Sequence, residues 1–386
     1  MKIHRLRISG FRSLKDVTWA PGGLNVLIGP NGTGKSNVLR CLDLISASAR
    51  GELGKWVQRS GGIDPLVWDG KAGEIALKIE FGKDSYAFDL QRLGRTSLYR
   101  IRHEELVGQR VTARGRTGVL SYLERQDRSI ADRGAIGNRL RGQDVSTSAE
   151  ETALSLFRRP LRGEGLPWVL QTKLADWRVY HDVNVFADSP VRGPVVARSE
   201  KRIEPDGGNL VSVLHTLYTG DREFKKDIDA AMRAAFGDDY DELLFPPAAD
   251  QRIQLRVRWK SLRREQSAAD LSDGTLRFLF LLTVLASPAP PSLIAIDEPE
   301  TGLHPSMMPV VAEYAADASD RAQIIFTTHS AQFLDAFGDV KPVTTVLKWR
   351  DGETVLKTIE GKEIEYWLKE YSLGTLFKSG ELEDMT

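Results

Sequence analysis

The sequence has almost no cysteine, no long apolar run and no net charge. Cys41 is the single cysteine among 386 residues. This excludes a disulfide framework and any zinc site built from several cysteines, and it suits a reducing compartment. The most apolar stretch, 276–286, is too short to span a bilayer, and the basic start, MKIHRLRISGFRSLK, lacks the apolar core of a signal peptide. We therefore expect a cytoplasmic protein with no membrane partner.

Because Lys and Arg together number 53, as do Asp and Glu, a nucleic-acid surface can come only from local charge. The segment 91–142 has twelve Arg, five Asp or Glu and no Lys. The strictly alternating QRIQLRVRWK (251–260) predicts a strand with an apolar face of Ile253, Leu255, Val257 and Trp259 and a basic face of Arg252, Arg256, Arg258 and Lys260. Two interpretations stay open: these cations contact DNA phosphates, or they form ordinary solvated surfaces.

The rest of the chain alternates between strand and helix signals. Loosely alternating runs over 74–107 predict antiparallel strands. Helices are predicted over 209–218, over 224–236 and over 149–157, where Ser148 and Glu151 have capping-box spacing. A hairpin with its turn at Asp351-Gly352 and a short helix near IEYWLKEY are predicted after it, whereas 163–205 shows no clear period.

The first motif that carries chemistry is GPNGTGKS (29–36), the P-loop. It follows the apolar run LNVLIG and precedes apolar residues at helical spacing, so it joins a strand to a helix. Its glycines let backbone N–H groups surround phosphate oxygens, and the helix adds its N-terminal dipole. Lys35 is predicted to reach the β- and γ-phosphates of ATP, and Ser36 to bind Mg²⁺. The predicted nucleotide-binding residues are Asn31, Gly32, Thr33, Gly34, Lys35, Ser36 and Asn37.

Two adjacent carboxylates end another apolar run, in SLIAIDEPETGLHP (292–305). Side chains alternate along a strand, so Asp297 and Glu298 are expected to point in different directions. Asp297 is predicted to bind Mg²⁺ together with Ser36, and Glu298 to orient or polarise the attacking water. The alternative is a pair of surface acids that cap a strand end.

Two further motifs suit a phosphate site. LSDGT (271–275), the signature turn, puts Ser272 at a helix N-cap beside Gly274, and such a helix start is a second phosphate-binding device. TTHS (327–330) presents His329 at the end of a core strand, where its imidazole could contact the γ-phosphate. A structural histidine is the alternative for His329.

The order GPNGTGKS, LSDGT, IDEPETGLHP, TTHS resembles the ATP-binding-cassette (ABC) superfamily. Within it the chain resembles the RecF/SMC-like branch and the ATPases related to the overcoming-lysogenization-defect (OLD) proteins, and the start IHRLRISGFRSLKD resembles that branch too. The resemblance covers 1–50 and 205–340 well. It implies an α/β fold, a P-loop NTPase with an ABC-type head, in which a mixed core sheet carries an antiparallel lobe. The implied domains are the head, 1–90 and 205–386, and an inserted Arg-rich or helical subdomain, 91–204.

The same resemblance implies a mechanism. Two heads sandwich two ATPs, so that Ser272 and Gly274 of one subunit close on the γ-phosphate held by Lys35 of the other. Arg12 is implied as a nucleotide contact and Pro299–Gly302 as an intersubunit loop.

Two positions depart from the family pattern. Asp273, also implied to bind nucleotide, stands where many cassettes have glycine, as is common in this branch. The glutamine of the Q-loop has no clear counterpart, because Gln58 is too close to the P-loop helix. His181 is the other candidate for that position.

Absences narrow the function. The chain has no heptad run such as SMC arms need, no CxxC hook, and little sequence after His329 for the Toprim nuclease domain of OLD proteins. We expect an ATPase that dimerises on ATP, as a homodimer or a higher oligomer, and that controls a separately encoded nuclease or effector in prokaryotic anti-phage defence. The alternatives are a RecF-like DNA clamp in repair, a transporter's cassette subunit, and a regulatory or toxin-neutralising ATPase, so DNA stays an open partner.

Overall fold

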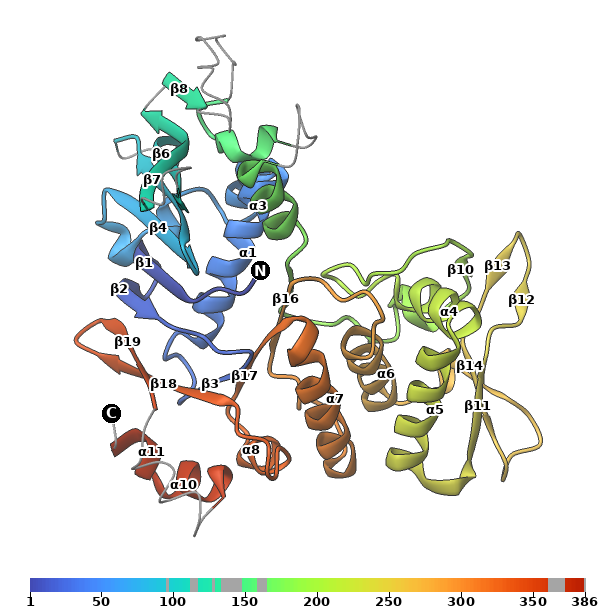
Figure 1. The fold of residues 1–386 in the computed structure, drawn as a ribbon. Helices are drawn as coiled ribbons and strands as arrows, with labels where there is room; N and C mark the ends of the chain where they lie inside the picture. Colours follow the sequence, from blue (N-terminus) through green and yellow to red (C-terminus); the bar gives the residue numbers. More distant parts are fainter. Residues whose placement is uncertain are drawn as a thin grey trace. The chain divides into compact units, whose positions relative to one another are not determined.

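The computed structural model describes residues 1–94, 97–111, 117–126, 129–132, 148–157, 165–359 and 372–384. These residues form two compact units (Figure 1). Unit 1 contains the described residues of Met1–Val179 and Val343–Ile359, and unit 2 those of Tyr180–Pro342 and Glu360–Met385. The P-loop belongs to unit 1, and the signature turn, the paired acids and His329 belong to unit 2.

Seven strands form an antiparallel sheet in unit 1, in the order β2-β1-β4-β5-β6-β7-β8. Burial alternates along β4, where Ile75, Leu77, Ile79 and Phe81 are buried, as expected for a sheet covered on one face. The strands are β1 (Arg5–Phe11), β2 (Leu14–Trp19), β4 (Glu74–Phe81), β5 (Asp84–Arg92), β6 (Tyr99–Val111), β7 (Thr117–Gln126) and β8 (Ser129–Asp132). The predicted antiparallel strands over 74–107 are therefore confirmed, and the Arg-rich segment extends the same sheet.

The P-loop strand lies in a second group of strands in unit 1. All five residues of β3 (Leu24–Ile28) are buried, and the strand pairs in parallel with β18 (Val343–Arg350). β18 forms an antiparallel hairpin with β19 (Glu353–Thr358). Asp351 and Gly352 both have positive φ, 51° and 83°, as a tight two-residue turn requires. The predicted hairpin and its turn are confirmed.

Three helices complete unit 1. α1 (Lys35–Arg50) follows the P-loop, α2 (Leu53–Arg59) comes next, and α3 (Leu166–Ala175) lies beside α1 (Figure 1). Ser46 Oγ of α1 donates a hydrogen bond to the Leu174 carbonyl of α3 at 2.9 Å. The sequence gave no signal for α3, or for the short strand β9 (Arg178–Tyr180) that follows it. The remaining turns are the 3₁₀ helices η1 (Asp64–Leu66), η2 (Trp68–Gly70) and η3 (Ala153–Leu156).

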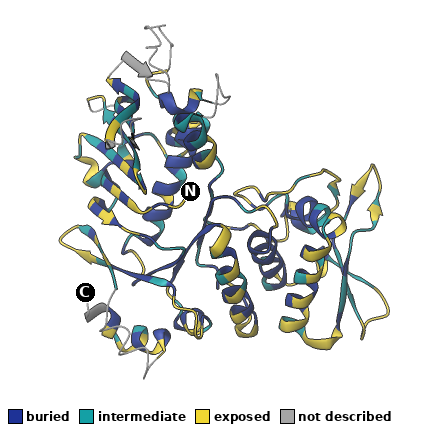
Figure 2. Cartoon of the chain, in the orientation of Figure 1, coloured by how far each residue is buried: buried dark blue, intermediate teal, exposed yellow. Residues whose placement is uncertain are grey.

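Unit 2 is built on two parallel core strands, β16 (Leu293–Asp297) and β17 (Gln323–Thr328). α7 (Met308–Arg321) connects them and packs against β17 and against α6 (Asp273–Leu285). β16, β17 and α6 are almost wholly buried, and α7 exposes one face (Figure 2). Because both strands are parallel, their carboxyl ends meet at one edge, which brings DEPETG and TTHS together.

The remainder of unit 2 is helical with small sheets. α4 (Leu210–Gly220) packs on α5 (Arg222–Phe236), and both predicted helices are confirmed. Asp229 of α5 accepts hydrogen bonds from the Tyr218 and Tyr240 hydroxyls at 2.6 and 2.7 Å, which ties α4, α5 and β11 together. The other elements are β10 (Val195–Val196), β11 (Tyr240–Leu244), β12 (Pro247–Ala248), β13 (Arg252–Ile253), β14 (Arg256–Trp259), β15 (Gln266–Ser267), α8 (Ala331–Asp335), α10 (Leu373–Ser379), α11 (Glu381–Asp384), η4 (Pro190–Arg192), η5 (Gly237–Asp239), η6 (Ala268–Asp270) and η7 (Pro305–Met307).

The α-helix predicted over 149–157 is wrong, because carboxylates make other contacts there. Glu151 caps α2 and accepts from the backbone N–H groups of Leu53 and Gly54 at 3.2 and 2.9 Å. The buried Glu104 accepts from Ala153 and Leu154 N–H, at 2.6 and 2.8 Å. Pinned in this way, the segment forms only the 3₁₀ helix η3.

The single strand predicted over 251–260 is also wrong. The segment contains two short strands, β13 and β14, which belong to different sheets. Its apolar face is real, since Ile253, Leu255 and Val257 are buried. The alternating sequence pattern predicted the buried side chains correctly, but it did not predict the break between β13 and β14. The helix predicted near IEYWLKEY lies outside the described residues.

Candidate nucleotide site

The P-loop is a tight turn that only glycine permits at its closest points. Gly32 and Gly34 have φ of 82° and 99°, in the region that L side chains rarely adopt. A Cβ on Gly34 would lie 2.3 Å from Thr354 Oγ1, and one on Gly29 would lie 2.3 Å from the Leu347 carbonyl oxygen. The loop therefore leaves its backbone bare, as a phosphate cradle needs.

Lys35 extends over this loop. Its Nζ donates to the carbonyl oxygens of Gly29 at 2.7 Å and Pro30 at 3.1 Å, and the residue is 5% exposed. α1 begins at Lys35 without a side-chain cap, so its first N–H groups lack intrahelical acceptors. An ammonium and a helix N-terminus at one loop fit the phosphates of a nucleotide.

A small polar network braces the loop, and the sequence gave no sign of it. Thr354 Oγ1, on β19, donates to the Thr33 carbonyl at 2.8 Å and lies within hydrogen-bond range of Ser13 Oγ at 2.7 Å. Asn37 Nδ2 also donates to Ser13 Oγ, at 2.8 Å. Three segments distant in sequence thus fix the P-loop backbone. The sequence alone does not show that β18 of the hairpin pairs with β3. That pairing brings Thr354 of β19 to the P-loop.

Arg12, predicted to contact nucleotide, lies just before Ser13 with a φ of 49°. Its Nε is buried and has no hydrogen-bond partner among the described residues. Burial, and then the neighbouring Arg40, lowers the pKa of the Arg12 guanidinium. A half-buried guanidinium whose Nε has no partner among the described residues is suited to an anionic ligand.

In unit 2 the two adjacent acids have separate partners. Thr327 Oγ1 donates to Asp297 Oδ1, and Asp297 Oδ2 lies 3.7 Å from His181 Nδ1. Glu298 Oε1 lies 3.1 Å from His329 Nδ1, within hydrogen-bond range. The two carboxylates therefore have different neighbours, although Glu298 lies beyond the end of β16.

The backbone at Glu298 is strained. Its φ is 45°, an uncommon value for a residue with a side chain, and such strain gathers at functional sites. The conformation is held by the Glu298 N–H, which donates to the Thr327 carbonyl at 3.1 Å. The Glu298 and His329 side chains are 37% and 47% exposed, so ligand and water can reach them.

Glu300 also belongs to this cluster, although the sequence singled out only its loop. It is 7% exposed and accepts from Thr328 Oγ1 at 2.5 Å and from the His329 N–H at 3.4 Å. Burial raises the pKa of Glu300 above its usual range. Glu300 ties the EPETG turn to the TTHS turn and so positions His329. The sequence signal that could have identified Glu300 is its place among the acidic residues of DEPE.

The signature turn begins α6 as predicted. Ser272 is the N-cap residue, and its Oγ accepts from the Thr275 N–H at 3.1 Å. A Cβ on Gly274 would lie 2.4 Å from the Gly302 carbonyl oxygen, which explains why glycine follows Asp273. The loop implied to lie between subunits, Pro299–Gly302, thus packs on the signature turn within one chain.

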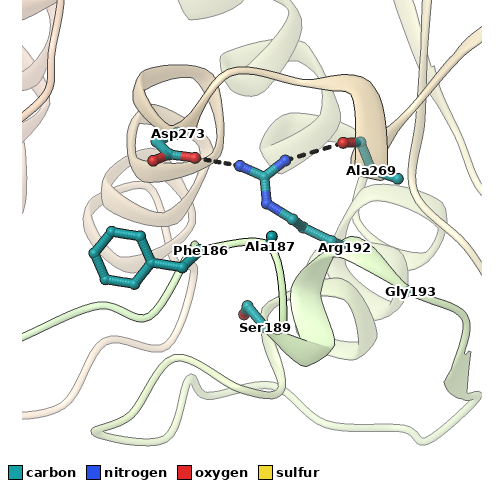
Figure 3. Close-up of a pocket in the computed structure, with 7 residues that line it drawn as sticks. All are labelled: Phe186, Ala187, Ser189, Arg192, Gly193, Ala269 and Asp273. Atoms are coloured by element: carbon teal, nitrogen blue, oxygen red, sulfur yellow. Dashed lines mark hydrogen bonds and ion pairs between the residues drawn. The ribbon is translucent and has the colours of Figure 1, made fainter.

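Arg192 holds the backbone that leads into this turn (Figure 3). Its guanidinium donates to the carbonyls of Ala268, Ala269 and Leu271 at 3.2, 3.2 and 2.7 Å, and it pairs with the Asp273 carboxylate. It lies at the edge of an open cavity of about 460 Å³. The charge of Asp273 is therefore compensated at the helix start.

The two candidates for the Q-loop position differ in surroundings. Gln58 is an exposed residue of α2 in unit 1, whereas His181 faces Asp297 within unit 2. Only His181 lies beside a predicted site residue of its own unit.

Two cations of the basic strand face, Arg256 and Arg258, are paired with carboxylates. Arg258 pairs with Glu242 at 2.7 Å and Glu265 at 2.9 Å, and Arg256 lies 3.6 Å from Glu265. The Arg-rich segment 91–142 lies partly outside the described residues. Contact with DNA stays a prediction for both. No helix in the described part of the chain is long and apolar enough to cross a membrane.

Comparisons with known proteins agree with this architecture. A family model described as "AAA domain, putative AbiEii toxin, Type IV TA system" matches residues 24–335. A crystal structure of the SmcHead bound to the C-winged helix domain of ScpA aligns with 95% of this chain and 100% of that chain, at a TM-score of 0.54 and 15% identity. The SMC head domain from Thermotoga maritima aligns with 94% of this chain and 100% of its own at 0.45 and 15%. The expected fold, an α/β P-loop NTPase with an ABC-type head, is confirmed by the first of these two alignments together with the family model.

One curated relative is similar over a short stretch. The OLD nuclease of Thermus scotoductus is 42% identical over 43 residues. That stretch is 11% of this chain and 8% of the relative. It supports the expected resemblance to OLD-family proteins over that short stretch.

Proposed function

Because the chain belongs to the AAA-domain family whose model spans residues 24–335, we propose that it binds ATP in the P-loop and hydrolyses it with the acids that end β16. The observation that carries this proposal is the separation of the two acids. Asp297 faces Thr327 and His181, and Glu298 faces His329. One carboxylate is then available for the metal and the other for water.

Nucleotide binding rests on the P-loop and its surroundings. The bare backbone of residues 31–34 and the N-terminus of α1 surround the phosphates, and Lys35 exchanges its two carbonyl acceptors for β- and γ-phosphate oxygens. Arg12 adds a second cation. Ser36 and Asp297 would hold Mg²⁺, which, when bound, neutralises phosphate charge.

Hydrolysis is assigned to Glu298 with His329. The Glu298 carboxylate accepts a hydrogen bond from the attacking water and orients it toward the γ-phosphorus. His329 Nδ1, 3.1 Å from Glu298 Oε1, holds that carboxylate in place, and Glu300 fixes His329 through its backbone N–H. The water oxygen bonds to phosphorus, the bond to the ADP oxygen breaks, and the proton leaves toward Glu298.

The signature turn is assigned to a second copy. The helix start at Ser272, Asp273 and Gly274 is a second phosphate-binding device in a chain that already contains a P-loop. In a head-to-head homodimer, the signature turn of each subunit contacts the ATP held by the P-loop of the other. A separately encoded nuclease or effector, in anti-phage defence, is the partner we propose. The short match to an OLD nuclease supports a nuclease partner. Co-purification with the product of the neighbouring gene tests it, and a neighbour without nuclease or effector chemistry counts against it.

Glu298→Gln tests the hydrolytic assignment. The amide is isosteric but a far weaker base, so ATP binding should persist while turnover falls by about 10²–10⁴-fold. The variant should also accumulate a nucleotide-dependent dimer, measured by light scattering with ATP. Unchanged turnover in this variant would show that Glu298 is not the water-orienting residue.

A further inference from the structure

Trp349 presents an exposed indole in unit 1. It lies on β18 and is 55% exposed, whereas the other tryptophans that the structure describes are buried or half-buried. Single exposed apolar side chains are ordinary on protein surfaces. The position of Trp349 therefore decides whether its indole has a role.

That position follows from the hairpin that carries the indole. Trp349 pairs with Thr354 across the hairpin, and directly opposite residues of an antiparallel pair point to the same face. Thr354 contacts the P-loop on that face, because its Oγ1 donates to the Thr33 carbonyl at 2.8 Å. The Trp349 side chain therefore leaves the hairpin on the side of the P-loop.

The strand also brings Trp349 to the level of the loop. β18 runs parallel to β3, with Val346 opposite Ile28, and the P-loop begins directly after Ile28. A Cβ on Gly29 would lie 2.3 Å from the Leu347 carbonyl oxygen, so the start of the loop lies against β18. Trp349 follows on β18, past the end of β3.

The two ends of a nucleotide need different surroundings. The phosphates suit the bare P-loop backbone and the cations of Lys35 and Arg12. The base is a flat aromatic ring, and stacking on an aromatic side chain stabilises it. In the described part of unit 1, Trp349 is the one exposed aromatic side chain, and it lies on the side of its hairpin where the phosphates are bound.

We propose that the indole of Trp349 stacks on the base of the nucleotide held by the P-loop, and that it makes the site favour purine over pyrimidine nucleotides. This rests on the proposed ATP-binding function. Stacking tolerates different bases because each base has an aromatic face. A purine with two rings covers more of an indole than a pyrimidine with one. ADP and GDP should therefore bind with similar affinity, and UDP more weakly.

Fluorine NMR of wild-type protein labelled with 5-fluorotryptophan tests the contact without measuring turnover. The chain has eight tryptophans, and Trp349→Phe identifies the resonance of Trp349. ADP is the ligand, because it lacks the γ-phosphate on which turnover and closure of the proposed dimer depend. ADP should shift this resonance, whereas inorganic diphosphate, which has no base, should leave it in place.

Binding affinities measured by calorimetry provide the second test. Trp349→Ala should weaken ADP binding about tenfold and leave the affinity for inorganic diphosphate unchanged. Val355→Ala is the matched control on the same hairpin. Val355 is 40% exposed and pairs with Lys348, so it points to the opposite face from Trp349. Its substitution should change neither affinity.

Binding of ADP and diphosphate by the wild-type protein with an unmoved Trp349 resonance overturns the stacking and leaves the nucleotide site standing. Equal losses of ADP and diphosphate affinity in Trp349→Ala overturn it too, because Trp349 would then support the loop rather than hold the base. UDP binding as tight as that of ADP overturns the purine preference. A wild-type protein that binds neither ADP nor diphosphate overturns the proposed function itself. The conservative Trp349→Phe variant supplies the assignment even if Trp349→Ala does not fold.

Discussion

Glu300 combines burial, a half-satisfied carboxylate and a position behind the proposed catalytic pair. One of its oxygens accepts from Thr328 and His329, and the other has no hydrogen-bond partner in the part of the chain that the structure describes. Burial, its first cause, raises the Glu300 pKa. At the residue scale, burial of the Glu300 carboxylate is therefore destabilising, while its hydrogen bonds hold the TTHS turn in place.

Glu300→Gln should stabilise the fold at neutral pH. A raised pKa in the folded state means that the native protein binds more protons than the unfolded one between the ordinary Glu value and the raised value, so stability falls as pH rises through that window. The amide has no such penalty. Urea unfolding from pH 4 to 8 should show an advantage for Glu300→Gln that grows with pH and then levels off.

His329 lies 4.0 Å from Glu300, so the same comparison is made in a His329→Gln background. A Glu300→Gln variant that is less stable than the parent at every pH would contradict this prediction.

Gly34 and Gly32 offer a matched pair within the P-loop. Both have positive φ, so alanine costs about 1–2 kcal/mol of backbone strain at either position. At Gly34 the added Cβ also meets Thr354 Oγ1 at 2.3 Å, whereas at Gly32 it meets nothing within 4 Å. Gly34→Ala should therefore lower the free energy of unfolding by about 1–3 kcal/mol more than Gly32→Ala. Equal losses in denaturant titrations would show that the loop relaxes around the methyl group.

At the scale of elements, α6 begins with a turn that is shaped before any ligand arrives. Arg192 bonds the carbonyls of Ala268, Ala269 and Leu271 and the Asp273 carboxylate. Figure 3 shows the bonds to Ala269 and Asp273. These are charge-assisted hydrogen bonds from a side chain that is 11% exposed. The start of α6 is thus preorganised by a residue far from it in sequence.

Arg192→Ala should loosen this turn. We expect a loss of about 2–3 kcal/mol in the free energy of unfolding and faster hydrogen exchange over residues 268–275. Arg198→Ala is the control, because the Arg198 side chain makes, among the described residues, only an exposed 3.8 Å pair with Glu200. This substitution should change stability by about 0.5 kcal/mol or less. Equal effects of the two substitutions would refute a preorganising role for Arg192.

Elements with strong local signals were predictable, and elements defined by distant contacts were not. The strands before the P-loop and the paired acids are continuous apolar runs, and their loops carry motifs. The helix expected at 149–157 failed because Glu151 and Glu104 bond N–H groups elsewhere. The roles of three residues were not predicted: Ser13, Thr354 and Arg192. Each contacts a loop many residues away, and a single sequence does not reveal such contacts.

At the scale of the whole molecule, the proposed sandwich requires two copies to exchange parts. A Lys35→Ala subunit retains its signature turn, and a Ser272→Arg subunit retains its P-loop. Each variant alone should lose ATP turnover. An equimolar mixture should recover about a quarter of the wild-type rate, because half of the dimers hold one intact composite site of two.

ATP turnover by the two variants after mixing, with each one alone as the control, provides the measurement. A mixture that is as inactive as its components, while wild-type protein remains active, would contradict the exchange of parts between subunits.

The brace on the P-loop has a consequence for biosynthesis. Thr33 and the threonine that bonds its carbonyl are 321 residues apart. At about 5–20 residues per second on the ribosome, roughly 15–60 s separate the appearance of the two. The P-loop emerges before the hairpin, and during that interval it lacks the hydroxyl that holds it. Nucleotide affinity should therefore develop late in translation, after the hairpin β18–β19 has left the exit tunnel and paired with β3.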